Sequence, residues 1–265
     1  MPEINIPFWT YPLLFLTSLI AGMVDAMAGG GGLITLPVLL NLGLPAPLAL
    51  GTNKFQASFG SVSAAYHYAK EGVVDVSHCW LGVGFTLLGA LGGAACVQAI
   101  DATFLGKLIP WLLAAIVGYM LCRPKLGQEE RPARLSETRF FIVFGLVLGF
   151  YDGFFGPGTG SFWTIALVLL LGQNFMRATG TTKVMNATSN VASLSLFALG
   201  GQVLLSAGLV MAMGQLIGSR LGAGLVVKRG SRFVQPIFFA MVSVIIARLL
   251  WVHYLSPWLR PAITN

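Results

Sequence analysis

The sequence has 265 residues, of which 56% are hydrophobic and only 9% are charged. Soluble domains carry about 25% charged residues, so this composition excludes a water-facing surface over most of the chain and indicates a membrane protein. About 20 apolar residues span a bilayer, so the chain has room for roughly eight to ten membrane segments and for no sizeable soluble domain. The net charge is +7. In a membrane protein the positions of the basic residues indicate which loops are cytoplasmic, and no nucleic-acid partner is expected.

Ten apolar segments follow one another, at residues 8–28, 32–43, 48–69, 78–99, 104–122, 138–156, 159–172, 176–199, 203–227 and 233–254. We expect the first to be a retained helix, because residues 1–10 contain no Lys or Arg and a cleaved signal peptide begins with basic residues. The second and seventh segments reach only about 20 Å, which is less than the roughly 30 Å hydrocarbon core. Each of these two short segments is preceded by a glycine-rich break.

The chain contains the same ordered set of features twice. The first copy has Asp25, four glycines at 29–32 and the sequence Gly-Thr-Asn-Lys at 51–54. The second copy has Asp152, the sequence Gly-Pro-Gly-Thr-Gly at 156–160 and Gly-Thr-Thr-Lys at 180–183. The second Asp follows the first by 127 residues, and the second Lys follows the first by 129. This near-constant offset predicts a first transmembrane repeat at 1–122, a cytoplasmic connecting loop at 123–137 and a second transmembrane repeat at 138–265.

The positive-inside rule tests how the segments are threaded. If all ten cross and the central loop is cytoplasmic, ten basic residues lie at the inner ends and three at the outer ends. Re-entrant short segments would instead move Lys228, Arg229 and Arg232 to the outside, so five crossings in each half are preferred. An odd number inverts the second copy, which is a common transporter plan.

The predicted fold is therefore an all-α polytopic membrane protein of two inverted repeats of about five segments each, including the short ones. Both termini are predicted to be periplasmic. The first glycine break is expected near the inner side of the membrane and the second near the outer side. Gly214, Gly218 and Gly222 form a small-residue face that is expected to serve close helix packing.

Backbone that leaves helical geometry cannot face lipid, so the two glycine breaks are expected to lie inside the protein. The first amides of the short helix after each break lack intrahelical partners, and with the helix dipole they favour an anion. A tight turn that needs no ligand is the alternative.

Lys54 and Lys183 lie about 9–12 Å inside their segments, and a buried cation in a membrane indicates a functional role. Thr, Asn and Gln side chains beside them add hydrogen-bond donors suited to an oxyanion. The predicted substrate-binding residues are Gly29, Gly30, Gly31, Gly32, Thr52, Asn53, Lys54, Gln56, Gly156, Gly158, Thr159, Gly160, Thr181, Thr182, Lys183 and Asn186. The alternative is that both lysines extend to the membrane interface.

Asp25 and Asp152 precede the breaks, and three roles stay open for them: pairing with the lysines, carrying a coupled proton, or capping exposed amides. The three histidines are scattered without a ligand pair, so no metal site is expected. The sequence has no phosphate-binding Gly-x-x-x-x-Gly-Lys-Ser/Thr loop. No cofactor and no catalytic residue is predicted, and the chain is not expected to be an enzyme.

The duplicated Gly-x-x-Asp-x-x-x-Gly element, together with Gly-Thr-Asn-Lys and Gly-Thr-Thr-Lys, resembles the TauE/SafE group of sulfite exporter permeases over nearly the whole chain. The resemblance implies a multi-pass protein of the bacterial cytoplasmic membrane that moves sulfite, organosulfonates or related anions. The function expected is secondary transport of a small anion between the repeats, in the direction of export. A passive anion channel and an intramembrane aspartyl protease using Asp25 and Asp152 are the alternatives, and a homodimer stays open.

Overall fold

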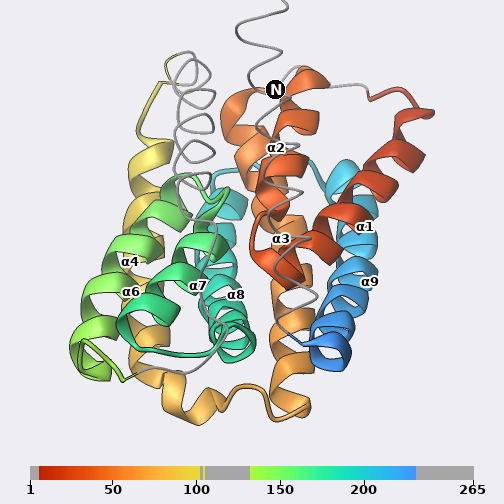
Figure 1. Cartoon of the computed structure of the whole chain (residues 1–265). Helices are drawn as coiled ribbons and strands as arrows, with labels where there is room; N and C mark the ends of the chain where they lie inside the picture. The colour runs from red at the N-terminus through yellow and green to blue at the C-terminus, as the bar shows by residue number, and fades with distance from the viewer. Residues whose placement is uncertain (1–5, 102–103, 105–131, 231–265) are drawn as a thin grey trace, which may run out of the picture.

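The computed structural model describes residues 6–101, 104 and 132–230, and every regular element in these ranges is helical. The elements are α1 (Thr10–Ala28), α2 (Gly31–Asn41), α3 (Ala46–Lys70), the 3-10 helix η1 (Val76–Cys79), α4 (Trp80–Gln98), α6 (Glu137–Phe154), α7 (Thr159–Leu170), α8 (Phe175–Leu199) and α9 (Leu205–Arg229) (Figure 1). The all-α prediction is confirmed for this part of the chain. Most of segment 104–122, residues 123–131 of the connecting loop and all of segment 233–254 lie outside the described residues.

Polar side chains are buried and large apolar side chains are exposed. Lys183 is 0% exposed, whereas Trp80 is 68% and Leu199 is 85% exposed. Three described stretches, Thr10–Ala28, Val76–Gln98 and Leu205–Arg229, are long and apolar enough to cross a membrane. Fully buried lysines together with many exposed large apolar side chains are unusual in a soluble protein and are expected of a chain surrounded by lipid.

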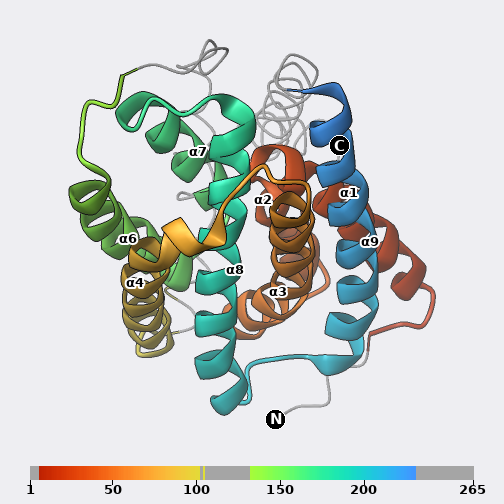
Figure 2. The same ribbon diagram turned by 90° about the horizontal axis from the view of Figure 1, so that it is seen from below.

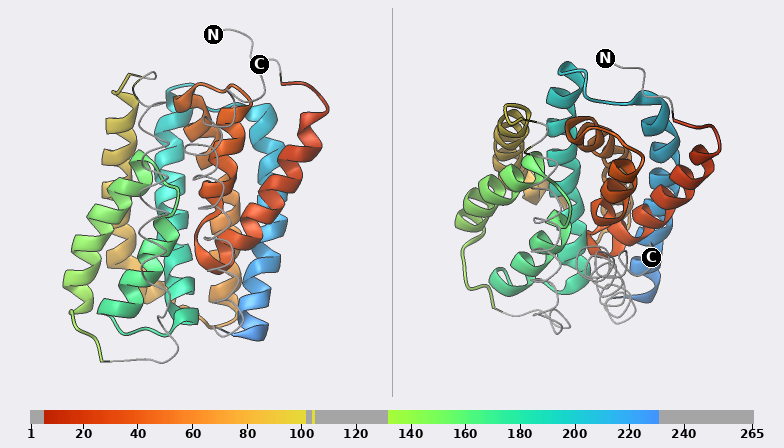
Figure 3. Two further views of the ribbon diagram at one scale, coloured as in Figure 1. Left: turned by 45° about the horizontal axis from the view of Figure 1, so that its top comes forward. Right: turned by 90° about the horizontal axis from the view of Figure 1, so that it is seen from above.

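Each glycine break joins two helices into a hairpin. Gly29 (φ 77°) ends α1, and Gly156 (φ 97°) and Gly158 (φ 85°) separate α6 from α7. Only glycine adopts such angles readily. The V formed by α1 and α2 opens toward one end of the molecule, and the V formed by α6 and α7 opens toward the opposite end (Figure 3). The short helices thus return beside the helices that precede them.

The two breaks touch each other at the closed ends of the Vs. A Cβ atom on Gly160 would lie only 2.5 Å from the Cα atom of Gly29. The expectation that the breaks lie at opposite sides of the membrane is therefore wrong. Its error was to treat the short segments as full crossings, whereas helices of 11 and 12 residues extend only about 17 Å.

Helices from the two sequence copies are interleaved. α1 packs along α9, α4 packs along α6, and α3 and α8 lie between these pairs (Figure 2). The small-residue prediction for α9 is confirmed, because Cβ atoms on Gly218 and Gly222 would lie 2.0 and 2.3 Å from the carbonyl oxygens of Leu19 and Met23 on α1. Such contacts allow the helix backbones to approach closely without an intervening side chain.

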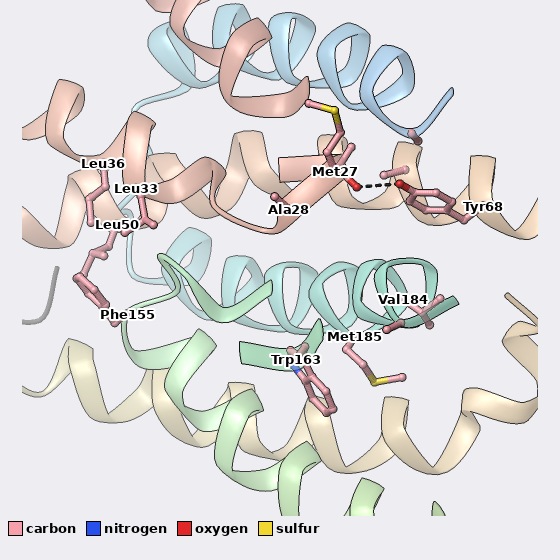
Figure 4. Close-up of a cluster of buried hydrophobic side chains, with 14 of the residues drawn as sticks. Met27, Ala28, Leu33, Leu36, Leu50, Tyr68, Phe155, Trp163, Val184 and Met185 are labelled. Atoms are coloured by element: carbon pink, nitrogen blue, oxygen red, sulfur yellow. Dashed lines mark hydrogen bonds between the residues drawn. The ribbon is translucent and has the colours of Figure 1, made fainter. Parts of the chain in front are cut away.

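Apolar side chains brace the two Vs. Figure 4 shows Phe155, from the second break, beside Leu33 and Leu50, which belong to the first copy. Phe155 is 1% exposed, so this contact is fully covered. On the first V, the hydroxyl of Tyr68 on α3 donates to the carbonyl of Ala26 at 2.8 Å (Figure 4). These contacts hold each helical end before its glycine break in a fixed position.

The α1–α9 contact generates the first prediction. Gly218→Ala should lower the stability of the purified protein by about 1–3 kcal/mol, because its new methyl group overlaps the Leu19 carbonyl. Gly224→Ala on the same helix should not, since the nearest atom to its Cβ would be 3.7 Å away and alanine favours helix. Melting temperatures in detergent provide the comparison. Equal melting temperatures for the two variants would contradict this packing.

Candidate functional site

Two buried ion pairs connect the sequence copies. Lys54 Nζ on α3 lies 2.7 Å from Asp152 Oδ1 on α6, and Lys183 Nζ on α8 lies 2.8 Å from Asp25 Oδ2 on α1. The lysine side chains are 2% and 0% exposed, and those of Asp152 and Asp25 are 4% and 14% exposed. The alternative in which both lysines extend to the membrane interface is therefore wrong. Pairing with the lysines is the role that the structure gives to both carboxylates.

Each carboxylate also accepts a second hydrogen bond. Asp25 Oδ1 accepts from the amide of Gly31 at 3.1 Å, so this residue also caps the first turn of α2. Asp152 Oδ2 accepts from the hydroxyl of Ser189. An aspartyl protease needs two carboxylates that share a proton, whereas each carboxylate here faces a different lysine.

Hydroxyl and amide groups fasten the short helices to the long ones. Thr35 on α2 donates to Asn53 Oδ1 on α3 at 2.6 Å, and the amide nitrogen of Gln56 donates to the same atom at 3.0 Å. In the second copy, the hydroxyls of Thr164 on α7 and Thr182 on α8 lie 3.0 Å apart. Thr164 follows Thr35 by the same 129 residues that separate the two lysines. The repeat offset alone could have identified this pair.

Two of the predicted substrate-binding residues form hydrogen bonds with residues outside the two ion pairs. The Thr52 hydroxyl accepts from the amide of Leu204 at 2.9 Å, at the start of α9. The Thr181 hydroxyl donates to the side chain of Gln173 at 3.4 Å. Both groups therefore position helix ends in this structure.

A narrow cavity of about 30 Å³ lies where the Vs meet the long central helices. Its lining consists of Asp25, Gly29, Gly32, Asn53, Lys54, Ala57, Asp152, Gly156, Gly158, Gly160, Asn186, Asn190 and Gln215. Ten of these residues were singled out from the sequence, and Ala57, Asn190 and Gln215 were missed. The volume suits about one water molecule.

The other predicted residues are not among those that line this cavity. They are Gly30, Gly31, Thr52, Gln56, Thr159, Thr181, Thr182 and Lys183. Lys183 does not line the cavity, but it forms an ion pair with Asp25, which does. The two lysines, equivalent in sequence, thus occupy different positions relative to the cavity.

Unpartnered amide groups face the cavity. Within the described residues, Asn186 Oδ1 and Gln215 Oε1 are buried and have no hydrogen-bond partner. Their residues are 5% and 1% exposed, and a buried polar atom without a partner costs about 1–3 kcal/mol. Because an amide oxygen and nitrogen can exchange places, either side chain can turn an N–H group toward a bound molecule. Both residues therefore leave a hydrogen-bonding group available in the lining of the cavity.

A second polar cavity, of about 260 Å³, lies beside the amino-terminal end of α8. Its lining includes Asp75, His78, Glu137, Arg177 and Thr181. Hydrogen bonds from Ser77 lower the pKa of Asp75, so this carboxyl is ionised at neutral pH. Thr181, in the lining of this cavity, is two residues from Lys183 on the same helix. Helix α8 therefore links this cavity to the buried Lys183–Asp25 ion pair.

Comparison with known proteins identifies the relatives of the chain. Residues 14–249 match the protein family described as "Sulfite exporter TauE/SafE". A "Probable membrane transporter protein" of Haemophilus influenzae is 43% identical over 91% of this chain and 96% of its own length. The "Probable membrane transporter protein YfcA" of Escherichia coli K12 is 41% identical over 95% of each chain. The "Probable membrane transporter protein ORF9" of a Sinorhizobium species is 36% identical over 96% of this chain and 98% of its own. No solved structure matches.

The crossed ion pairs generate the second prediction. Lys183→Met and Asp25→Asn should each destabilise the protein by about 3–5 kcal/mol, because each leaves one charged or polar partner buried alone. The double variant Asp25→Asn/Lys183→Met should be less destabilised than the sum of the two, which a double-mutant cycle of unfolding in detergent measures. Lys70→Met, at an exposed position on α3, serves as the matched surface substitution. Strictly additive losses would show that the two side chains do not interact.

Proposed function

Because the chain belongs to the sulfite exporter TauE/SafE family of membrane transporters, we propose that it is a secondary transporter of a small anion. The substrate class is a sulfur oxyanion such as sulfite or an organosulfonate. Sulfite export is the activity named in the family's description, and it supplies the proposed direction. The single observation that carries the proposal is a buried ammonium group, Lys54, in the lining of a central cavity.

The chemistry around Lys54 suits an oxyanion. The side-chain amides of Asn186, Asn190 and Gln215 line the same cavity, and each can offer N–H donors to sulfur-bound oxygens. The α7 helix begins at Thr159, directly after Gly158 in the lining, so the positive end of its dipole favours negative charge at the cavity. Bare glycine backbone lets an anion approach this helix end without obstruction.

The cavity must expand for this substrate. A sulfur oxyanion has at least four heavy atoms, while the present cavity of about 30 Å³ accommodates about one water molecule. Separation of the touching ends of the two Vs, at Gly29 and Gly160, is the movement that would enlarge it. The present arrangement therefore corresponds to a closed state of the transport cycle.

We propose that the two copies are inverted repeats that alternate in opening. Three observations support this: the Vs open toward opposite ends (Figure 3), the ion pairs are reciprocal, and α1–α9 packing mirrors that of α6–α4. Movement of one V would expose the cavity to one side of the membrane, and movement of the other V to the opposite side. The cavity that includes Thr181 and Arg177 lies at the end we assign to the cytoplasm, and the termini are assigned to the periplasm.

Anion binding is tested by thermal stabilisation of the purified protein. Sulfite, sulfonates, thiosulfate, sulfate and carboxylates are compared, and a bound anion at 100 times its Kd should add about 2.7 kcal/mol of stability. Lys54→Ala should fold but lose this response. Lys70→Ala, on the same helix and exposed, should keep it. An undiminished response in Lys54→Ala would remove Lys54 from the binding site.

Transport by a carrier is distinguished from conduction by a channel in proteoliposomes. We expect saturable uptake of labelled sulfite that is accelerated when unlabelled sulfite is present on the opposite side. This acceleration arises because a loaded carrier reorients in both directions. Single-channel currents in planar bilayers, without such acceleration, would identify a passive anion channel instead.

A further inference from the structure

Among the described residues, the groups in and behind the central cavity carry no surplus positive charge for an anion. Its lining contains one cationic side chain, Lys54, and two carboxylates, Asp25 and Asp152. Counting Lys183 behind Asp25, the four buried groups sum to zero. A monovalent anion would leave the site with one uncompensated negative charge, and such a charge is unfavourable away from water.

The ammonium of Lys54 is also largely occupied. It has three hydrogens to donate, and it already donates to Asp152 Oδ1 at 2.7 Å and to Asn190 Oδ1 at 3.1 Å. One hydrogen of the ammonium is left for an anion, and an anion that becomes the main partner of Lys54 would displace the carboxylate of Asp152. The displaced carboxylate would keep only the Ser189 hydroxyl while lying beside a second negative charge.

We propose that Asp152 takes up a proton when an anion binds to Lys54, so that the protein moves one proton together with each anion. This inference rests on the proposed function and names the ion that accompanies the anion, so that export is driven by the gradient of the anion and not by that of the proton. The proton, drawn from water on the side to which the cavity is open, adds to Asp152 Oδ1. The ion pair to Lys54 separates, and Lys54 stays protonated. On the opposite side the anion leaves, the proton returns to water and the ion pair forms again.

The charge balance follows from this exchange. A monovalent anion and its proton add no net charge, so the buried site stays neutral in both states. A divalent anion would carry one net negative charge across with its proton. The cycle requires no covalent step and no other ion.

The surroundings favour Asp152 over Asp25 as the proton carrier. Asp152 and its lysine both line the cavity, whereas the lysine of Asp25 does not. Asp25 is further held by the backbone amide of Gly31, which stays in place when the side chain titrates. Asp152 is instead held by Ser189, whose hydroxyl can either donate or accept. The neighbourhood of Asp152 thus accommodates both of its protonation states.

In the described part of the chain, Asp25 lines the same cavity as Asp152, and few other ionisable groups lie nearby. Among the described residues of the elements packed against α6, α8 contributes Lys183 and Arg177, α4 contributes Cys96 and α7 contributes none. Tyr151 precedes Asp152 on α6, and its hydroxyl donates to the carbonyl of Pro157 at 2.8 Å. On α3, the cation that contacts Asp152 is Lys54. The group that changes charge when Lys54 is taken by an anion is therefore Asp152.

The test measures protons taken up by the wild-type protein in detergent when an anion binds. Ethanesulfonate and sulfate serve as probes because both are fully ionised near neutral pH, whereas sulfite itself titrates there. We expect about one proton for each anion bound, measured with a pH-indicating dye in weak buffer. Because one proton is taken up with each anion, the affinity should fall about tenfold for each unit by which the pH is raised.

Variants assign the proton to its carrier. Asp152→Asn should bind the probes with an affinity independent of pH and without proton uptake. Glu71→Gln, an exposed substitution at the end of α3, should retain both the proton uptake and the pH dependence of binding. Proton uptake that persists in Asp152→Asn would overturn the assignment to Asp152.

The wild-type result separates this inference from the proposed function. Probe binding without proton uptake, at an affinity independent of pH, would overturn proton coupling and leave an anion transporter. Failure of the probes and of every anion in the stabilisation screen to bind would overturn both. The wild-type measurement decides the inference even if Asp152→Asn fails to fold.

Discussion

Two ammonium groups are buried among apolar helices, and the remainder of the structure follows from how they are neutralised. An unpaired buried charge is strongly destabilising, whereas a pair with further hydrogen bonds is tolerated. Here the carboxylate for each lysine comes from the other sequence copy, at 2.7 and 2.8 Å. Neither copy can bury its own lysine alone, so the ion pairs also enforce the association of the two halves. The interleaved packing of α1 with α9 and of α6 with α4 brings the four groups together.

The glycines make this charge arrangement geometrically attainable. Asp25 lies on the last turn of α1 and Asp152 on that of α6, so both carboxylates reach the centre only if the helices end there. Gly29 and Gly160 let the two helix ends touch through their backbones, and Gly156 leaves room for the ammonium of Lys54. A Cβ atom at position 156 would lie 2.9 Å from Lys54 Nζ. Because these glycines have no side chain, the ion pairs can form and the backbone also lines the cavity.

The sequence was sufficient for the helical class and for most of the residues that line the cavity, because lysine, aspartate and glycine runs are conspicuous among apolar residues. It did not yield the hairpin geometry, since a short apolar helix that turns back and one that crosses have the same composition. Asn190 and Gln215 escaped notice for another reason. Polar amides occur in many membrane helices, and only the packing of α8 and α9 brings these two to the cavity. Ser189 and Thr35 likewise act through contacts between distant segments.

The two sequence copies differ at several positions near the cavity, and these differences make the site asymmetric. At the repeat offset of 129 residues, Ala57 corresponds to Asn186, Gln56 to Met185 and Gly60 to Ser189. The first two exchanges place the free amide of Asn186 in the cavity and leave Gln56 bonded within α2 and α3. The third gives the carboxylate of Asp152 a hydroxyl partner, whereas Asp25 is held by a backbone amide. The two lysines also differ in position, since Lys54 lines the cavity and Lys183 does not. In the transporter that we propose, the helices common to both sequence copies would move, and the positions at which the copies differ would bind the substrate.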